Sequence, residues 1–401
     1  MGPSTDLTPP MGPSTDAPER QWAGAMALLA IALLTLIAAA PAVAASPFRG
    51  NAMWVWYVSA SGGDPATLAR QADRRGLDAV YVKSGDAGSY WSQFDRALVR
   101  AGHDRGLDVC AWQFVYGSDP RREARVGAAA AERGADCLII DAESDYEGRY
   151  AAADTYIRVL RREVGPRFPI ALASFPYVDY HPAFPYSVFL APGAADANLP
   201  QLYWYAIGDP IAAAFRHTYA YNRPYDRRIF PVGQTWMDPP RRQVLDFRRL
   251  AAAYGPTGVS WWSWQETSRR MWPRLTGPVR GVAPGPRPRR EYAPLARGAR
   301  GDLVVWAQEL LRGAGIDVPV NGRFNRRTGR AVRTLQRQGG LEPTGAVDDE
   351  TWKALLAGDP EPVRWSRRGS APSLRRAAAA PPTASLAPLA TEIPPPGSRI
   401  P

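Results

Sequence analysis

The stretch RGLDAVYVK, residues 75–83, recurs along the chain as RGLDVCAWQFV at 105–115 and as RGADCLIID at 133–141. Each copy starts where a segment with helical periodicity stops, and each continues into a run of apolar residues. Glycine suits the left-handed residue just past a helix C-terminus. Each copy therefore predicts a helix end that is followed directly by a strand.

The same spacing extends over the first two thirds of the chain. Apolar runs typical of buried strands recur in steps of 26 to 32 residues, beginning near Met53, Ala79, Asp108, Cys137, Pro169, Pro200, Ile229 and Gly258. Such a step holds one strand, one helix and two loops. The runs are continuous rather than alternating, as in a parallel sheet covered on both faces. Eight such units predict an α/β fold, a (β/α)8 TIM barrel.

Composition divides the whole chain into five predicted parts. A Pro/Gly/Arg-rich segment is typical of a linker, and an Ala/Pro/Ser/Arg-rich end is typical of a disordered tail. The parts are an export signal or N-terminal anchor at 1–45, the barrel at 46–274, a linker at 275–294, a compact domain at 295–357, and a disordered tail at 358–401.

The N-terminal part carries an apolar stretch at 23–40, followed by PAVAAS, whose small residues match a signal-peptidase site. The alternative is an uncleaved membrane anchor, because about 18 apolar residues can just span a bilayer. Either way we expect a secreted or cell-wall-associated protein. Cys110 and Cys137 both fall in predicted strands; an exported location would permit a bond between them, and two buried thiols are the alternative.

Charge and histidine content exclude some classes of function. The 49 Lys+Arg against 38 Asp+Glu give a net charge of +11, which suits nucleic acid, a membrane surface or an anionic wall polymer. No nucleic-acid motif occurs and the arginines form no single stripe, so nucleic acid is not expected. His103, His181 and His217 lack a metal-ligand spacing. We therefore predict no metal, no cofactor and no zinc peptidase or amidase chemistry.

Two carboxylates in LIIDAESDYEG, residues 138–148, are the candidate catalytic groups. Residues i and i+2 of a strand point to one face, so Asp141 and Glu143 would share a face at the strand's C-terminal end. Barrel active sites lie at that end. Glycoside hydrolysis needs a protonated acid beside a second group, and apolar walls with a neighbouring carboxylate would raise the pKa of Glu143. Glu143 is thus the predicted general acid and Asp141 its partner; the alternative is a structural carboxylate pair.

Aromatic and polar side chains gather near the predicted strand ends. Flat rings stack on sugar faces, although they also fill barrel cores. The predicted substrate-binding residues are Tyr203, Tyr205, Gln234, Trp262, Trp264 and Glu266.

The segment 295–357 resembles the common three-helix peptidoglycan-binding module of cell-wall enzymes. The resemblance rests on a lead-in, a first helix stripe, an Asn-Gly-Arg-Phe turn and a closing segment. Its residues include Leu295, Gly298, Gly301, Val304, Gln308, Leu311, Asn321, Gly322, Phe324, Thr328, Val332, Gln336, Gly345, Val347, Trp352 and Leu355. The resemblance implies that peptidoglycan, or a related cell-wall glycan, is a partner.

The barrel resembles the family 25 lysozymes and, more loosely, the family 18 chitinases, through the D-x-E on its fourth strand. The resemblance implies that Glu143 is the proton donor and that Asp141 positions the substrate's acetamido group. The sequence departs from family 25 in having no Asp in its first strand, and from family 18 in having Ile139 where an Asp is usual.

These predictions combine into one expectation. The chain is expected to be a monomeric, exported cell-wall protein that binds peptidoglycan and hydrolyses a glycosidic bond next to an N-acetylated sugar, as a muramidase does. Two alternatives stay open. One is a non-catalytic wall-binding pseudo-glycosidase, and the other is a glycosidase for another exopolysaccharide.

Overall fold

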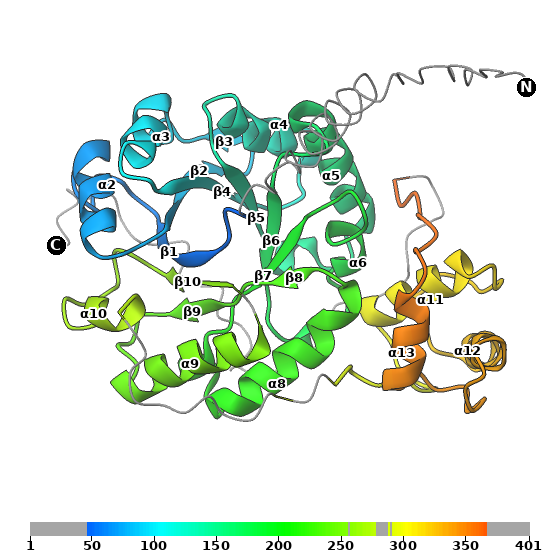
Figure 1. The fold of residues 1–401 in the computed structure, drawn as a ribbon. Coiled ribbons are helices and arrows are strands. Elements are labelled where there is room, and N and C mark those ends of the chain that lie inside the picture. The colour runs from blue at the N-terminus through cyan, green and yellow to red at the C-terminus, as the bar shows by residue number, and fades with distance from the viewer. Residues whose placement is uncertain (1–45, 256, 278–287, 289–290, 367–401) are drawn as a thin grey trace, which may run out of the picture. The chain divides into compact units, whose positions relative to one another are not determined.

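The computed structural model describes residues 46–255, 257–277, 288 and 291–366 (Figure 1). The predicted export signal or anchor at 1–45, with its apolar stretch at 23–40, lies outside the described residues. So do most of the predicted linker and residues 367–401 of the predicted tail.

Parallel strands form the centre of the barrel in the described part of the chain (Figure 1). They are β1 (Gly50–Val55), β2 (Ala79–Asp86), β4 (Asp108–Val115), β5 (Cys137–Ala142), β6 (Ile170–Ser174), β7 (Ala197–Pro200), β8 (Arg228–Ile229), β9 (Val232–Gln234) and β10 (Gly258–Trp262). A two-residue strand, β3 (Ser89–Tyr90), adds an antiparallel hairpin to β2.

The ring closes through one divided strand. β8 pairs with β7 and β9 pairs with β10, and only Phe230 and Pro231 separate β8 from β9. A further parallel bridge joins Gln201, just after β7, to Val232. β1 completes the circle by pairing with both β10 and β2. The described strands therefore occupy eight positions, and the predicted (β/α)8 architecture is confirmed.

Aspartate caps and left-handed glycines set the ends of the first barrel helices. Aspartate side chains cap α2 (Pro65–Arg74), α3 (Arg96–His103) and α4 (Pro120–Ala131) by accepting from the backbone N–H three residues later. Behind α2, α3 and α4, the glycines of the repeated motif have φ of 69°, 70° and 92° at Gly76, Gly106 and Gly134. The left-handed residues expected there are thus confirmed.

The remaining barrel helices in the described part of the chain are α5 (Tyr150–Val164), α6 (Tyr186–Phe189), α7 (Trp204–Ile207), α8 (Ile211–Asn222), α9 (Arg241–Tyr254) and α10 (Trp272–Leu275). The short helix α6 is all that follows β6, apart from a 3-10 turn at Val178–Tyr180.

The prediction of the sixth strand is wrong in position. The run from Pro200 to Ala206 was expected to be a strand, but β7 ends at Pro200 and α7 follows. The true strand carries Asn198, which is buried and donates through Nδ2 to Asn222 Oδ1 at 2.8 Å. This buried polar residue breaks the apolar run that marks the other strands. Consequently Tyr203 directly precedes α7 and Tyr205 lies on it, so neither residue is on a strand.

Inside the ring, a second hydrophobic core is separate from the one between strands and helices. Its largest fully buried side chains are Trp54, Tyr81 and Trp112, with Trp54 and Trp112 ring centroids 5.6 Å apart. Cys110 and Cys137 face each other across paired strands β4 and β5 and form a disulfide. Of the two alternatives for these cysteines, the structure has the bonded one.

The C-terminal domain has three helices, as expected: α11 (Asp302–Gly313), α12 (Arg326–Gln338) and α13 (Asp349–Leu356). Two buried glutamines organise it. Gln308 accepts from the backbone N–H of Asn321 and Gly322, and Gln336 accepts from that of Gly345. These side chains fix the turns before α12 and α13, which explains why glutamine stands in two apolar helix stripes.

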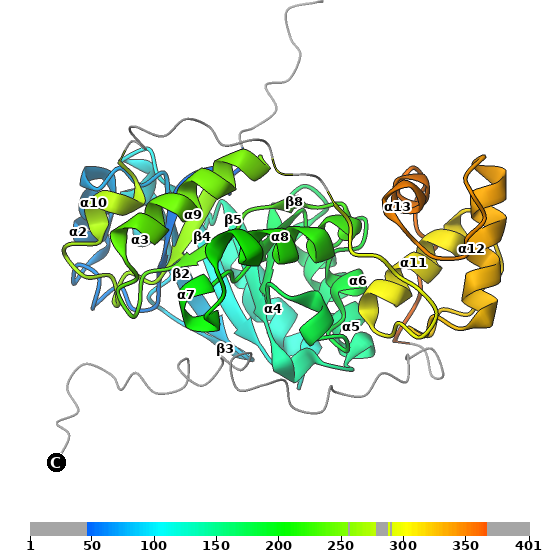
Figure 2. The ribbon, with the colours of Figure 1, turned by 90° about the horizontal axis from the view of Figure 1, so that it is seen from below.

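A buried carboxylate ties this domain to the barrel. Asp302, fully buried at the start of α11, accepts from the hydroxyls of Tyr150 and Tyr225 and from both the N–H and the hydroxyl of Ser187, at 2.7 to 2.8 Å. Its own N–H donates to Pro182 O at 2.8 Å. Figure 2 shows α11 beside α6. The Pro/Tyr-rich connection after β6 therefore provides the surface to which the small domain docks.

The residues at 358–366 differ from the expected disordered tail. Trp365 is 2% exposed, and its ring lies 5.0 Å from that of Tyr150. The N–H of Ser366 donates to Asp154 at 2.9 Å. One buried tryptophan in a Pro- and Arg-rich stretch holds this segment against α5.

Candidate active site

Asp141 and Glu143 lie together at the C-terminal end of β5. The Nε2 atom of Gln201 donates to Asp141 Oδ1 at 2.9 Å and to Glu143 Oε1 at 3.1 Å. Gln201 follows β7 directly. One amide group thus bridges both carboxylates from across the barrel mouth, so the two acids face the same side.

The two acids differ in how much solvent reaches them. Asp141 is the fifth residue of β5 and is 3% exposed, whereas Glu143 follows the strand and is half-buried. Glu143 stands immediately before a 3-10 turn at Ser144–Tyr146, which carries the chain away from the mouth. Glu143 is consequently the acid that a bound molecule can reach first.

Burial raises the pKa of both carboxyl groups, and the charge of Glu143 raises that of Asp141 further. For Asp141, burial is the largest cause and the charge of Glu143 adds to it, while Lys83 and the Gln201 hydrogen bond oppose the rise. For Glu143, burial again raises the pKa, the Gln201 bond lowers it, and Asp145 raises it slightly. A pair of this kind holds a proton at higher pH than an ordinary carboxylic acid.

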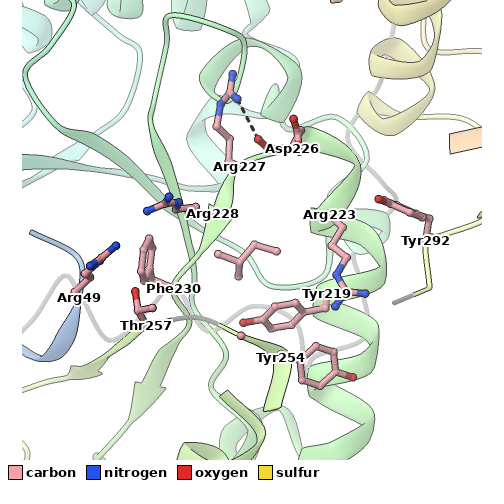
Figure 3. Close-up of a pocket in the computed structure, with 12 residues that line it drawn as sticks. Arg49, Tyr219, Arg223, Asp226, Arg227, Arg228, Phe230, Tyr254, Thr257 and Tyr292 are labelled. Carbon is pink, nitrogen blue, oxygen red and sulfur yellow. Dashed lines mark hydrogen bonds between the residues drawn. The ribbon is translucent and has the colours of Figure 1, made fainter. Parts of the chain in front are cut away.

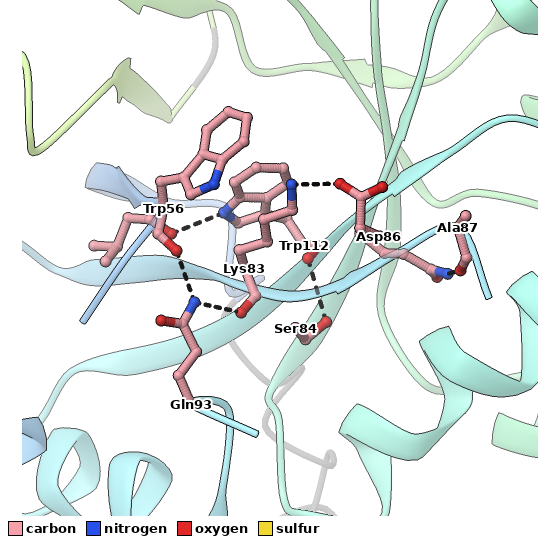
Figure 4. Close-up of polar contacts among 9 residues, drawn as sticks. Trp56, Lys83, Ser84, Asp86, Ala87, Gln93 and Trp112 are labelled. Atoms are coloured by element: carbon pink, nitrogen blue, oxygen red, sulfur yellow. Dashed lines mark hydrogen bonds and ion pairs between the residues drawn. The ribbon is translucent and has the colours of Figure 1, made fainter. Parts of the chain in front are cut away.

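A caged lysine supplies the positive charge near the pair (Figure 4). Lys83 is 1% exposed, and its Nζ lies 2.6 Å from Asp86 Oδ2. The same nitrogen lies 4.0 Å from the ring centroid of Trp56, 4.5 Å from that of Trp91 and 4.9 Å from that of Trp112. Burial lowers the pKa of Lys83, and the Asp86 carboxylate opposes that effect. The cage keeps a cation at the strand ends beside Asp141.

Half-buried rings surround this polar centre. Tyr57 and Trp91 stack with centroids 5.4 Å apart, and Phe114 meets Tyr116 edge-on at 4.9 Å. Trp262, at the end of β10, lies 5.4 Å from Trp112. Rings with one exposed face at the mouth of a barrel are suited to stacking on sugars. The half-buried set is Tyr57, Trp91, Phe114, Tyr116, Trp236 and Trp262.

The structure brings three of the predicted substrate-binding residues near the acids. Tyr203 is 8% exposed, and after burial the charges of Asp141, Glu143 and Glu266 raise the pKa of its hydroxyl. Glu266 is exposed and accepts from Ser263 Oγ at 2.8 Å. Tyr203 therefore borders the acids, Glu266 lies near Tyr203, and Trp262 packs on Trp112 beside the caged Lys83.

The other three predicted residues have different surroundings. Gln234 is fully buried and accepts from the backbone N–H of Tyr205 and Ala206, so it holds α7 in place. Tyr205 is 39% exposed on that helix. Trp264 packs outside the ring, with its centroid 4.8 Å from Trp272 and under the guanidinium of Arg75 at 4.7 Å. Trp264 is thus not brought to the acids.

Gln201 is the site residue that sequence reasoning missed. It stands in the run that was assigned to a strand starting at Pro200, which would have put it at the closed end of the barrel. The signal that could have identified it is the spacing: with β7 ending at Pro200, Gln201 is the first residue after its strand, the place that Glu143 holds after β5.

The described residues contain neither a candidate metal site nor a candidate membrane-spanning helix. Within residues 46–366, as far as they are described, no three His, Cys, Asp or Glu side chains gather in a metal-binding group. Over the same described part of the chain, no helix combines the length and apolar character needed to cross a bilayer.

Comparison with known proteins identifies the small domain. Residues 300–355 match the family model described as a putative peptidoglycan binding domain. The expected peptidoglycan-binding module is thereby confirmed at the C-terminal end of the chain. No curated protein matches the chain.

Solved structures similar to the chain include chitinases and a cortex-lytic enzyme. The catalytic domain of a hyperthermophilic chitinase from Pyrococcus furiosus is 14% identical, covering 55% of this chain and 85% of its own, with a TM-score of 0.45. The spore cortex-lytic enzyme SleL of Bacillus cereus is 11% identical, with 57% and 73% covered and a TM-score of 0.45. A putative chitinase A from Streptomyces coelicolor is 14% identical, with 58% and 98% covered and a TM-score of 0.43. The barrel assignment itself rests on the strand pairing described above.

Proposed function

We propose that the chain is an exported cell-wall glycosidase that cleaves peptidoglycan next to an N-acetylated sugar, with Glu143 as general acid and Asp141 as its partner. The observation that carries the proposal is the single Gln201 amide that bonds both carboxylates. It keeps two acids of raised pKa together at the end of the barrel where active sites lie.

The geometry of the pair favours retention of configuration at the anomeric carbon. Bonds of 2.9 and 3.1 Å to one nitrogen put Asp141 Oδ1 and Glu143 Oε1 no more than about 6 Å apart. Inverting enzymes need roughly 6.5–9.5 Å between their carboxyl groups to place a water. The shorter separation suits a first step in which Glu143 protonates the leaving oxygen and the glycosidic bond breaks, while the carbonyl oxygen of an acetamido group held by Asp141 forms the new bond to the anomeric carbon.

Solvent access divides the roles of the two acids. Half-buried Glu143 can reach a glycosidic oxygen, and its raised pKa lets it carry the proton that the leaving group takes up. Nearly inaccessible Asp141 can touch only a substituent that enters the mouth, such as an acetamido group. Burial and the charge of Glu143 raise the pKa of Asp141 well above its usual range, and Lys83 opposes that rise.

The predicted substrate-binding residues take two kinds of role in this proposal. Tyr203 would contact the sugar because it borders the acids, and Trp262 and Glu266 would contact it from the neighbouring strand end. Gln234 would act through α7, whose N-terminal turn it holds, and Tyr205 would contribute an exposed ring from that helix. The predicted substrate-binding role of Trp264 has the least support, since its ring packs on Trp272 and Arg75.

The C-terminal module would keep the enzyme on its insoluble substrate. A peptidoglycan-binding domain matched at 300–355 supports a cell-wall glycan as partner, and tethering raises the local concentration of the barrel on that polymer. We propose domain limits at 46–274 and 295–357, monomeric action, and export to a secreted or wall-associated location. The Cys110–Cys137 disulfide supports export, because such bonds persist in oxidising compartments.

One rival has an observation of its own. β1, with the sequence GNAMWV, carries no carboxylate, and Asp141 is only 3% exposed, which would suit a wall-binding protein without activity. A glycosidase for another exopolysaccharide would keep Glu143 and change the substrate. Both rivals share the fold and the module with the leading proposal.

One set of assays separates these three functions. Purified peptidoglycan is incubated with the protein, and the pellet is tested for bound protein while the supernatant is tested for new reducing ends. Binding together with reducing ends supports the proposal, and binding alone supports the pseudo-glycosidase. Reducing ends released only from other bacterial exopolysaccharides support the third function.

A further inference from the structure

We propose that a second ligand site lies at the opposite end of the barrel, where a basic pocket binds a phosphorylated saccharide. Figure 3 shows this pocket. Arg49 precedes β1, Arg228 begins β8 and Thr257 precedes β10. The pocket therefore sits at the N-terminal ends of the strands, away from Asp141 and Glu143. Its volume of about 480 Å³ is in the range of small-molecule sites.

The pocket is strongly basic, which suits an anionic ligand. Arg49, Arg223, Arg227 and Arg228 line it against one acid, Asp226. Arg49 and Arg228 are exposed, and among the residues that the structure describes neither guanidinium has an acceptor. Guanidinium groups bind phosphate through parallel N–H bonds, so unpaired arginines on two sides of one cavity suit a phosphoryl group.

Buried polar atoms without partners mark the same place. Tyr219 is 3% exposed, and its hydroxyl has no hydrogen-bond partner among the described residues. The buried Nε atom of Arg227 also has no hydrogen-bond partner among the described residues, and burial lowers the pKa of that guanidinium. Buried polar groups are nearly always paired in folded proteins. A bound ligand whose entry shifts these side chains slightly would pair them.

The rings in the pocket suit the saccharide part of the ligand. Tyr219 and Tyr254 lie with centroids 4.3 Å apart, and the guanidinium of Arg223 lies 5.5 and 5.6 Å from the two rings. Half-buried Tyr254 and Tyr292 present aromatic surface beside the arginines. A flat apolar face next to a cationic group recognises a sugar that carries a phosphate.

The test is calorimetric titration of the purified chain with N-acetylglucosamine 1-phosphate, N-acetylglucosamine and inorganic phosphate. We expect the sugar phosphate to bind at least tenfold more tightly than either of its parts. The Arg49→Gln/Arg228→Gln double variant should lose tenfold or more in affinity. The Arg121→Gln/Arg125→Gln double variant has the same net charge but changes exposed residues of α4, and it should stay within twofold of the wild type.

A third variant guards against indirect effects. Tyr219→Phe removes a hydroxyl that has no partner, so folding should be unchanged while affinity for the sugar phosphate falls about threefold. Glu143→Gln should leave this binding unchanged, which separates the pocket from the proposed active site. The proposal is overturned if inorganic phosphate binds as tightly as the sugar phosphate, if no binding is seen, or if the Arg49 and Arg228 change has no effect.

A sedimentation assay identifies the source of the ligand. Cell walls are used before and after removal of their phosphodiester-linked polymers. If Arg49→Gln/Arg228→Gln reduces sedimentation with untreated walls only, the ligand is a unit of an anionic wall polymer. If sedimentation is unchanged while the calorimetric loss stands, the ligand is a free sugar phosphate.

Discussion

Asp141 and Glu143 accept hydrogen bonds from the same nitrogen atom, Nε2 of Gln201. The acids belong to β5 and its following loop, whereas the amide follows β7, so the contact crosses the mouth of the barrel. A structural pair of carboxylates at a strand end would need no such shared donor. The bridge makes the three side chains one unit, whose protonation is set jointly.

Removing the bridge should shift the pH dependence of activity. The Gln201 bond lowers the pKa of both carboxyl groups, so Gln201→Leu should move both limbs of the kcat/KM profile to higher pH. We expect kcat to fall about tenfold or more, as for loss of one donor in an active site. Profiles of wild type, Gln201→Leu and the α2 control Gln71→Leu check this. A profile that stays in place in Gln201→Leu would argue against a joint unit.

Asp141 should reduce stability at neutral pH. Burial raises its pKa in the folded state, so the penalty of ionising it is absent below the unfolded value of about 3.9 and grows as pH rises. Asp141→Asn should raise Tm at pH 7 by about 2–4 °C, the effect of ~1 kcal/mol in a domain of this size. The gain should vanish near pH 4, while activity falls at least roughly 100-fold. A lower Tm at pH 7 would show that the carboxylate stabilises the fold.

The buried carboxylate at the domain contact should have the opposite effect when it is removed. Asp302→Ala leaves the hydroxyls of Tyr150 and Tyr225 and the N–H of Ser187 without their acceptor. We expect a loss on the order of 3 kcal/mol, since each unsatisfied buried donor costs ~1–3 kcal/mol. Hydrogen exchange of α6 and α11 measures it locally. Asp317→Ala, which removes an exposed partner of Arg327, is the control and should change little.

Asp302 also predicts a pH dependence of the contact. Burial raises its pKa to about 6, above the unfolded value of 3.8. Its favourable contribution is therefore fully present below pH 3.8 and is lost as pH rises through 6. Exchange at α11 should be slower at pH 5 than at pH 7 after correction for the intrinsic rate. Equal protection at the two values would contradict the assignment.

The disulfide inside the barrel should contribute to stability. Cys110→Ala/Cys137→Ala opens a loop with a sequence separation of 27 residues, for which chain-entropy arguments give about 3 kcal/mol. We expect Tm to fall by roughly 6–12 °C. Thiol titration of the unreduced, denatured protein should find no reactive thiol. Two reactive thiols per chain would remove this support for export.

Most of the barrel could be predicted because its strands are covered on both faces. A strand such as Cys137–Ala142 is a continuous apolar run for that reason, and the glycines at 76, 106 and 134 mark the helix ends before it. β7 was misplaced because Asn198 is buried by bonding to Asn222, a contact that spacing cannot reveal. The role of Gln201 was missed for the same reason, because Gln201 directly follows β7.

For other site residues, the success of the prediction depended on where the strand ends. Asp141 and Glu143 were placed together by alternation, and their common donor bears this out. Trp262 and Trp264 were both predicted to lie near the strand ends, but β10 ends at Trp262 and the ring of Trp264 packs on Trp272 in the outer layer. The docking role of the connection after β6 was equally hidden, because it depends on Asp302, which is more than a hundred residues away.

If Glu143 is the acid of a wall-cleaving unit, its removal should stop the loss of turbidity of purified cell walls. Wild type, Glu143→Gln and Glu147→Gln are compared at equal concentration; Glu147 lies on the same loop but bonds His181 at 2.8 Å instead of Gln201. We expect Glu147→Gln to keep most of the wild-type rate and Glu143→Gln to lose 100-fold or more. Equal rates for the wild type and Glu143→Gln would contradict it.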